Sequence, residues 1–373
     1  MLNDSDSLAV RAAALTDVDA LVALEVACFD EDRLSRRSFQ RLIRSDAASV
    51  TVLAQGDALI GYVCTVYRRG TALARLYSLA IDPQQRGHGW SRHLMTRAED
   101  EAVARGFTHL RLEVRPDNSA AIALYGALGY RQFAVADDYY EDHSPALRME
   151  KRIRVLSDIP RLQVPFYAQT TEFTCGSASL MMAMAALDHQ QAVNRSRELM
   201  LWREATTIFM TSGHGGCGPH GLALAAHKQG FSVSLMLSQA GPLFLDGVRD
   251  PDKKAVMELV QTDFMTALAA RGVPVDYQPL SSTELARCIS RGEIPVVLIS
   301  SYRLNGNKAP HWVVVAAADE QCLYVHDPDL DTHDAATATD NAYIPITHQA
   351  FDRMARFGAQ GLRAAVIVAK PTA

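Results

Sequence analysis

The sequence predicts a mixed α/β (α+β) protein of two domains. Its 373 residues exceed what a single hydrophobic core usually serves. The first half alternates strand-like and helix-like apolar patterns, and the second half opens with an apolar helix and later contains a strand hairpin. We therefore expect a mixed twisted sheet with flanking helices at residues 1–152, a linker at residues 153–161, and a helix-plus-antiparallel-sheet domain at residues 162–373.

The composition favours a cytoplasmic enzyme over a nucleic-acid-binding or membrane protein. Charged residues make up 21% of the chain, and a net charge of −5 provides no basic surface for nucleic acid or an anionic membrane. The opening residues lack a basic start followed by an apolar stretch, and no later apolar run approaches membrane-spanning length. Six cysteines without a Cys-x-x-Cys pair indicate free thiols in a reducing compartment. The oligomeric state does not follow from these properties.

The first domain begins with helix-like and then strand-like segments. A capped amphipathic helix is expected from Thr16 and a shorter helix at residues 38–43. Residues 50–54 and 59–66 predict a hairpin, and residues 72–81 predict a third strand.

A glycine-rich loop joins this third strand to the next helix, with the sequence Arg86-Gly87-His88-Gly89-Trp90-Ser91. Such a loop directs backbone N–H groups and the helix dipole at one point, which suits a pyrophosphate. Arg86 and His88 would flank that phosphate, although either is also compatible with a solvated loop side chain.

A strand at residues 110–115 follows and places Arg111, Glu113 and Arg115 on one face. Asn118 caps the next helix, which carries Tyr125 among its apolar residues. By themselves, Glu113 fits a solvated strand residue and Tyr125 an ordinary core residue.

These motifs resemble the GCN5-related N-acetyltransferase (GNAT) superfamily over roughly residues 8–152. The resemblance rests on Gln84-x-x-Gly87-x-Gly89 and on Asn118 followed by Leu124-Tyr125 and Leu128-Gly129-Tyr130. Leu112-Glu113-Val114-Arg115 and Tyr139-Tyr140 are most similar to the ribosomal-protein-alanine acetyltransferase branch. The resemblance implies acetyl-coenzyme A as co-substrate, Glu113 as general base and Tyr125 as general acid. It also implies these cofactor-binding residues: Leu79, Ala80 and Ile81 for the pantetheine, Arg86, Gly87, His88, Gly89, Trp90 and Ser91 for the pyrophosphate, and Asn118.

In the second domain, a polar loop runs from Gln169 into an apolar helix that begins near Cys175. Backbone N–H groups and the positive dipole end of a helix stabilise a thiolate, so Cys175 is a candidate nucleophile. Gln169 could turn back so that its amide and the Cys175 N–H form an oxyanion hole. A small buried cysteine at the start of a core helix is the alternative.

A second glycine-rich loop, at residues 213–221, carries His214, Cys217 and His220. Three ligands of this kind invite a zinc interpretation, but no fourth ligand stands at a conventional spacing. We therefore expect a loop beside a substrate cleft and no metal.

A buried strand is expected at residues 294–300, followed by a hairpin that joins residues 311–316 to residues 322–328. A three-residue turn centred on Asp319 would place Val315 opposite Leu323 and His311 opposite Asp327. Cross-strand partners have Cβ atoms ~5 Å apart, so Asp327 would orient His311, and His311 would take the proton of the thiol. Asp329 has the same parity and is the alternative partner.

Gln169, Cys175-Gly176, His311 and Asp327-Pro328 together resemble the papain-like fold over roughly residues 160–370. The resemblance is to the peptidases that process bacteriocin leaders at double-glycine sites. It implies Cys175 as nucleophile, His311 as general base and acid, Asp327 as orienting residue and Gln169 as oxyanion donor. Such peptidases are usually joined to a membrane transporter, which this sequence does not contain, so double-glycine specificity is not expected.

The sequence thus predicts a bifunctional enzyme that acetylates a peptide or protein amine and cleaves a peptide through a thiol. Two alternatives stay open for the second domain. One is a peptide-binding module without hydrolysis, and the other is acyl transfer to an amine, which uses the same acyl-enzyme.

Overall fold

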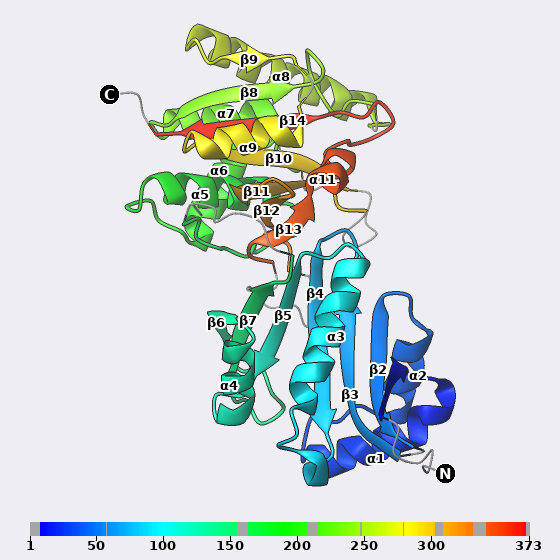
Figure 1. Ribbon diagram of the computed structural model, residues 1–373. Helices are drawn as coiled ribbons and strands as arrows, with labels where there is room; N and C mark the ends of the chain where they lie inside the picture. Colours follow the sequence, from blue (N-terminus) through cyan, green and yellow to red (C-terminus); the bar gives the residue numbers. More distant parts are fainter. Residues whose placement is uncertain are drawn as a thin grey trace. The chain divides into compact units, whose positions relative to one another are not determined.

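The computed structural model describes residues 8–56, 58–154, 163–207, 215–246, 248–278, 280–302, 309–330 and 341–370 (Figure 1). The chain divides into two compact units, Met1–Leu156 and Ser157–Ala373. Each unit contains one seven-stranded sheet with helices packed against it. The predicted mixed α/β class is confirmed.

The sheet of the first unit has the strand order β1-β2-β3-β4-β5-β7-β6. All neighbours pair antiparallel except β4 and β5, which are parallel. The pairing of β4 with β5 ends at Arg75 and Arg111, so the two strands part beyond these residues. The strands are β1 (Leu8–Ala12), β2 (Ala48–Gln55), β3 (Ala58–Tyr67), β4 (Leu73–Ile81), β5 (His109–Val114), β6 (Arg131–Ala136) and β7 (Ala146–Arg152).

Helices cover both faces of this sheet and create two apolar cores. One core contains Leu21 and Phe39 from the first two helices, and the other contains Leu94 from the helix after the glycine loop. The predicted short helix at residues 38–43 is confirmed and begins two residues earlier, because the Ser35 hydroxyl accepts a hydrogen bond from the Ser38 N–H at 3.1 Å. The helical segments are η2 (Leu15–Asp17), α1 (Val18–Cys28), α2 (Arg36–Arg44), η3 (Pro83–Gln85), α3 (Trp90–Ala104) and α4 (Ser119–Ala127).

The sheet of the second unit has the order β13-β12-β11-β10-β14-β8-β9. It is antiparallel apart from the short β8–β9 pair. Its central strands are apolar throughout because helices cover both faces. The strands are β8 (Ser232–Leu237), β9 (Val275–Asp276), β10 (Ile294–Ser300), β11 (Pro310–Ala318), β12 (Cys322–His326), β13 (Ile344–Thr347) and β14 (Ala364–Ala369).

The helices of the second unit are divided between the two faces of its sheet. The core on one face includes α5 (Cys175–Leu187) and α7 (Pro219–Lys228), with α6 (Arg195–Ala205) and α8 (Pro251–Ala270) packed alongside. The core on the other face includes α9 (Ser282–Ser290) and α11 (His348–Met354). Almost every side chain of α5 is buried, so this helix is held firmly against the sheet. In the part of the chain that is described, no helix is both long and apolar enough to span a membrane.

The predicted end of the loop at residues 213–221 was wrong. Helix α7 begins at Pro219, three residues before the expected start. Proline is favoured in the first helical turn because its missing N–H would have no partner there. Gly221 lies inside the helix, where an added Cβ would lie 2.3 Å from the Ala205 carbonyl oxygen, so close packing with α6 requires glycine.

Candidate active sites

In the first unit, β4 contains an irregularity next to the point where it parts from β5. Thr65 pairs with Leu76 and Cys64 pairs with Ser78, so Tyr77 has no residue opposite it on β3. This β-bulge interrupts the ladder and re-aims the strand. Backbone N–H groups near a bulge can therefore donate hydrogen bonds to a bound molecule instead of to a neighbouring strand.

Glu113 lies on β5 at this position and is 7% exposed. Its Oε2 accepts a hydrogen bond from Arg75 Nε at 2.8 Å, and its Oε1 lies 3.3 Å from Arg148 Nε. Arg75 also donates to the Tyr139 hydroxyl. Two guanidinium groups thus fix the carboxylate, and each oxygen keeps a lone pair for a water or an N–H group. The alternative that Glu113 is simply a solvated residue is wrong.

Tyr125 lies on α4 and is buried in the core together with Tyr130. Burial raises the pKa of Tyr125 to about 12, because an apolar environment disfavours the phenolate. The phenol is therefore neutral at physiological pH and retains a proton to donate. Among the described residues, no hydrogen bond joins Tyr125 to Glu113.

The glycine loop has the backbone that the sequence predicts. Gly87 and Gly89 have φ of 84° and 82°, in the left-handed region that favours glycine. An added Cβ would meet nothing within 4 Å at either position, so conformation and not crowding requires these glycines. Gly89 is the N-cap of α3, and the helix therefore begins at Trp90 with its first N–H groups directed at the loop. Arg86 donates to the Ile81 carbonyl at 3.3 Å, and His88 Nδ1 lies 3.2 Å from the Gln85 carbonyl.

The other residues predicted to bind the cofactor lie on neighbouring elements. Leu79, Ala80 and Ile81 end β4, with Ala80 and Ile81 buried and Leu79 packed partly against the α3 core. Asn118 uses its side-chain oxygen to accept a hydrogen bond from the Ala121 N–H at 3.1 Å. Its side chain therefore caps α4, as predicted.

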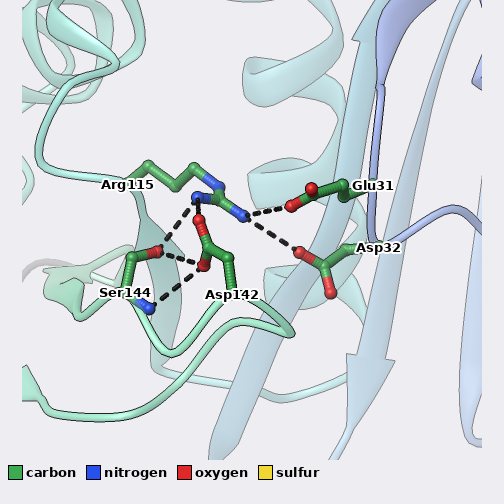
Figure 2. Close-up of polar contacts among 5 residues, drawn as sticks. All are labelled: Glu31, Asp32, Arg115, Asp142 and Ser144. Carbon is green, nitrogen blue, oxygen red and sulfur yellow. Dashed lines mark hydrogen bonds and ion pairs between the residues drawn. The ribbon is translucent and has the colours of Figure 1, made fainter.

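Arg115, just beyond β5, joins two loops that are far apart in the sequence (Figure 2). It donates to Asp142 Oδ2 at 2.7 Å and to the Ser144 hydroxyl at 3.0 Å, both between β6 and β7. It also contacts Asp32 at 3.3 Å and Glu31 at 3.5 Å, in the loop after α1. A hydrogen bond from Arg115, the leading cause, lowers the pKa of Asp142. One guanidinium therefore ties both loops to the end of the strand that carries Glu113.

In the second unit, Cys175 is the first residue of α5, as predicted, and is 7% exposed. His311 Nε2 lies 2.6 Å from Asp327 Oδ1, and His311 is close enough to Cys175 for the thiol to influence its pKa. Burial, the largest single effect, lowers the pKa of His311, but Asp327 and then Cys175 outweigh it. The pKa of His311 is therefore well above its ordinary value. The three predicted side chains thus lie together as one series, with a hydrogen bond between His311 and Asp327.

The hairpin register that led to this prediction was wrong. Val315 pairs with Val325 and not with Leu323, and the register shifts between Val315 and Ala317. Continuing from the Val314–His326 pair places Asp329, not Asp327, opposite His311. Asp327 therefore reaches His311 across a diagonal. A β-bulge inserts one extra residue, which period-two alternation alone does not reveal.

Gln169 is near this series but is directed at Asp329. Its Nε2 donates to Asp329 Oδ1 at 3.3 Å, and its backbone N–H donates to the Pro328 carbonyl at 2.9 Å. The Asp329 N–H donates to Asp327 Oδ1 at 3.0 Å. The side-chain oxygen of Gln169 is buried and has no hydrogen-bond partner among the described residues. Among the described residues, Gln169 makes no hydrogen bond with Cys175, and the side chain predicted to donate to the oxyanion instead contacts the segment that follows Asp327.

Sequence reasoning missed a buried carboxylate that fixes the Gln169 loop. Glu198, from α6, accepts hydrogen bonds from the Thr170 N–H at 2.8 Å and from the Thr170 hydroxyl at 2.7 Å. It also accepts one from the Tyr167 hydroxyl at 3.0 Å. These contacts hold the backbone on both sides of Gln169. The Asn194-x-x-Arg197 cap shows only that a helix begins there, so nothing in the sequence directed attention to Glu198.

Cys217 packs directly beside the start of α5. A Cβ added to Gly176 would lie 3.1 Å from Cys217 Cβ and 3.1 Å from Trp312 Cδ1. Trp312 Nε1 donates to the Cys217 carbonyl at 3.0 Å. Burial and then the charge of Cys175 raise the pKa of Cys217, so it is held as a neutral thiol. Cys217 is therefore part of the wall around Cys175.

The zinc alternative for this segment is left without support from the described residues. His214 lies outside them, and within them no group of three or more His, Cys, Asp or Glu side chains is arranged to hold a metal ion. Burial lowers the pKa of His220 to about 4, so its ring is neutral.

Comparison with protein families identifies both units. Residues 164–369, more than half of the chain, match the model of the Peptidase_C39 like family. The chain belongs to this family. Residues 18–130 match the Acetyltransferase (GNAT) family, so the first unit contains a GNAT domain. The predicted fusion of the two families is confirmed.

Curated relatives include N-acetyltransferases. The [ribosomal protein bS18]-alanine N-acetyltransferase of Salmonella typhimurium is 39% identical over 79 residues, which are 20% of this chain and 53% of the relative. The corresponding Escherichia coli protein is 42% identical over 67 residues, 18% of this chain and 45% of the relative. The chain thus spans about half the length of these relatives. The crystal structure of the Escherichia coli enzyme is 26% identical with a TM-score of 0.37, covering 41% of this chain and 97% of that structure.

Proposed function

We propose that the chain is a bifunctional enzyme. Residues 1–152 transfer an acetyl group to a peptide or protein amine, residues 162–373 cleave a peptide through a thiol, and residues 153–161 join them. For the second activity, the supporting observation is the hydrogen-bonded pair of His311 and Asp327 next to Cys175. For the first, it is the fixed carboxylate of Glu113 beside the point where β4 and β5 part.

Acetyl-coenzyme A is the proposed donor and supplies an acetyl group activated as a thioester. The first N–H groups of α3, after the left-handed Gly87 and Gly89, suit its pyrophosphate. The end of β4, from Leu79 to Ile81, offers apolar side chains and strand backbone to its pantetheine.

Glu113 and Tyr125 carry out the proton transfers in the first unit. Glu113 accepts the proton of the acceptor amine through a water, because guanidinium groups already hold both of its oxygens in place. Tyr125 is neutral and donates a proton to the leaving thiolate. Backbone N–H groups released by the bulge at Tyr77 polarise the thioester carbonyl.

In the second unit, Cys175 is the nucleophile. His311 takes the thiol proton, and Cys175 Sγ attacks the peptide carbonyl carbon to form a tetrahedral adduct. The C–N bond breaks as His311 returns the proton to the departing amine, and water then hydrolyses the thioester. Asp327 keeps His311 in orientation. The backbone N–H of Cys175 and the Gln169 amide bind the developing oxyanion once Gln169 leaves Asp329.

The two activities can act on one peptide, because cleavage exposes an α-amine and an N-acetyltransferase modifies an amine. Candidate peptides are incubated with the protein and acetyl-coenzyme A, and the product masses are read. We expect cleaved products in the intact protein, no cleavage in Cys175→Ser, and no acetylation in Glu113→Gln. Cleaved products whose new termini are never acetylated contradict action on a single peptide. Cleavage that survives Cys175→Ser contradicts the thiol mechanism.

The orientation of Gln169 favours a second candidate for the second unit. Because its amide donates to Asp329, the oxyanion site is incomplete, which suits a module that binds peptide without hydrolysis. Alkylation with iodoacetamide separates the two. Rapid labelling of Cys175 that depends on His311 supports catalysis, and labelling no faster than that of the buried Cys288 supports binding alone.

A further inference from the structure

A hollow of about 390 Å³ lies in the second unit, away from Cys175. It is bordered by the segment after α11, the start of β14 and the residues that follow β8 and β9. Two guanidinium groups and several neutral hydrogen-bonding groups line it, and no carboxylate is among the lining residues. These are Ser238, Tyr277, Arg356, Gln360, Gly361 and Arg363.

Arg363 is held in place by neutral groups. Its Nη1 donates to the Leu280 carbonyl, and its Nη2 donates to the Asp352 carbonyl at 3.0 Å. Burial and then the positive charge of Arg356 lower the pKa of Arg363. Two like charges therefore face the same hollow, and one is fixed there by the backbone. An anion between the two charges would be attracted by both.

Two carboxylates near the hollow already accept hydrogen bonds. Asp352 accepts them from the Ser282 N–H at 2.8 Å and the Ser282 hydroxyl at 3.1 Å, where it fixes the start of α9, and its charge partly offsets the lowering of the Arg363 pKa. Asp246 accepts one from Gln360 Nε2 at 2.6 Å, at the edge of the hollow. Arg356 is exposed and, within the described parts of the chain, has neither an ion-pair nor a hydrogen-bond partner. Its five N–H donors are available to a bound oxyanion.

The hollow is separated from Cys175 by the core of the sheet. Continuing the β10–β14 register by two residues places Ile299 opposite Arg363. Ile299 is fully buried, together with Ala365, in the core that includes α9 and α11. Cys175 belongs to the core on the other face of the sheet. The Arg363 carbonyl accepts a hydrogen bond from the Ser238 N–H at 2.9 Å, which joins two of the segments around the hollow. The hollow is therefore a site of its own.

We propose that the hollow binds an oxyanion, with a peptide carboxylate and inorganic phosphate as the two sources of this chemistry. Arg356 and Arg363 line the hollow together with neutral hydrogen-bonding groups. Planar guanidinium groups bind carboxylates and phosphates with two parallel hydrogen bonds, which gives direction as well as affinity.

The test uses the full chain with Cys175→Ala and isothermal titration calorimetry. Inorganic phosphate is the probe for the oxyanion site. Tetra-alanine with a free C-terminal carboxylate is compared with tetra-alanine amide to test whether a peptide carboxylate is the ligand. We expect phosphate binding that Arg356→Gln weakens about tenfold, the loss of one charge-assisted contact. Arg353→Gln is the matched control, because Arg353 is an exposed arginine of α11 that donates to the Gln349 carbonyl and does not line the hollow. We expect it to change phosphate affinity by less than about twofold.

Tetra-alanine with a free carboxylate is expected to compete with phosphate, and the amide is not. Equal competition by acid and amide, or competition by neither, contradicts the peptide carboxylate as the ligand. No phosphate binding at millimolar concentration, or equal losses in Arg356→Gln and Arg353→Gln, overturns the site altogether. Alkylation of Cys175 in the unsubstituted chain tests the peptidase proposal separately, so the two failures are distinguishable.

Discussion

Asp327 contacts His311 diagonally across the β11–β12 pair, with 2.6 Å between Asp327 Oδ1 and His311 Nε2. The same oxygen accepts the Asp329 N–H at 3.0 Å. Asp327 is therefore fixed by the backbone and in turn fixes the imidazole. Because His311 also lies next to Cys175, a single carboxylate orients the imidazole beside the thiol and raises its pKa.

Asp327→Asn is expected to destabilise the protein in a pH-dependent manner. The pKa of His311 is raised in the folded state, so its protonation contributes stability that is fully present below the unfolded pKa of ~6.5. That contribution disappears as the pH rises through the folded pKa. Thermal melts at pH 6 and pH 9 should therefore show a larger loss in Tm at pH 6. A loss that is equal at both values, or larger at pH 9, contradicts the raised pKa.

Arg115→Gln is expected to raise the KM for an acceptor peptide about tenfold while leaving the KM for acetyl-coenzyme A unchanged. The substitution releases Asp142 and Ser144 on one loop and Asp32 on the other (Figure 2), and Tyr139 on the first of these loops contacts the Glu113 site through Arg75. Steady-state kinetics with each substrate varied separately measures the effect.

Arg105→Gln is the control for Arg115→Gln. Arg105 follows α3 and makes an exposed ion pair with Glu101 at 3.0 Å, so its removal should change neither KM. An Arg115→Gln protein in which only the acetyl-coenzyme A KM rises would place the effect of Arg115 on the donor side.

Tyr125→Phe is expected to lower kcat about a hundredfold without loss of stability. Phenylalanine keeps the apolar packing of the ring, and the hydroxyl has no hydrogen-bond partner among the described residues. Because burial raises the pKa of Tyr125 to about 12, the intact enzyme should show no loss of activity from this group at any pH below about 11. Acetylation kinetics and thermal melts of both proteins measure this. An unchanged kcat in Tyr125→Phe would show that Tyr125 is a core residue and not the general acid.

The sequence indicated the candidate residues of the second site but not how they are arranged. A thiol at a helix start and an alternating hairpin are local patterns, and the structure places Cys175 and His311 near each other. The bulge that moves Asp327 to a diagonal position depends on packing of the two strands in the sheet. The same holds for the direction of Gln169, which depends on Asp329, 160 residues away.

In the first unit, local features also followed from the sequence, whereas contacts between distant strands did not. The glycine loop and the alternating strand at Glu113 are visible in the sequence, because left-handed backbone and strand parity are local properties. The guanidinium groups that fix Glu113 come from β4 and β7, and no spacing rule connects them. Ion pairs between distant strands are set by the sheet order, which the sequence pattern did not determine.

Gly176→Ala is expected to disturb the Cys175 site and to destabilise the protein by ~1–3 kcal/mol, the usual cost of overpacking. The added Cβ would lie 3.1 Å from both Cys217 Cβ and Trp312 Cδ1, and neither the backbone-bonded Trp312 nor the buried Cys217 can retreat easily.

Gly126→Ala in α4 is the matched control, because an added Cβ there meets nothing within 4 Å. It should stabilise the protein by up to ~1 kcal/mol through helix propensity alone. Denaturant unfolding and iodoacetamide labelling of Cys175 measure both proteins. If Gly176→Ala labels Cys175 as fast as the unsubstituted chain and unfolds at the same denaturant concentration, the close packing of Cys217 against the start of α5 is not what shapes this site.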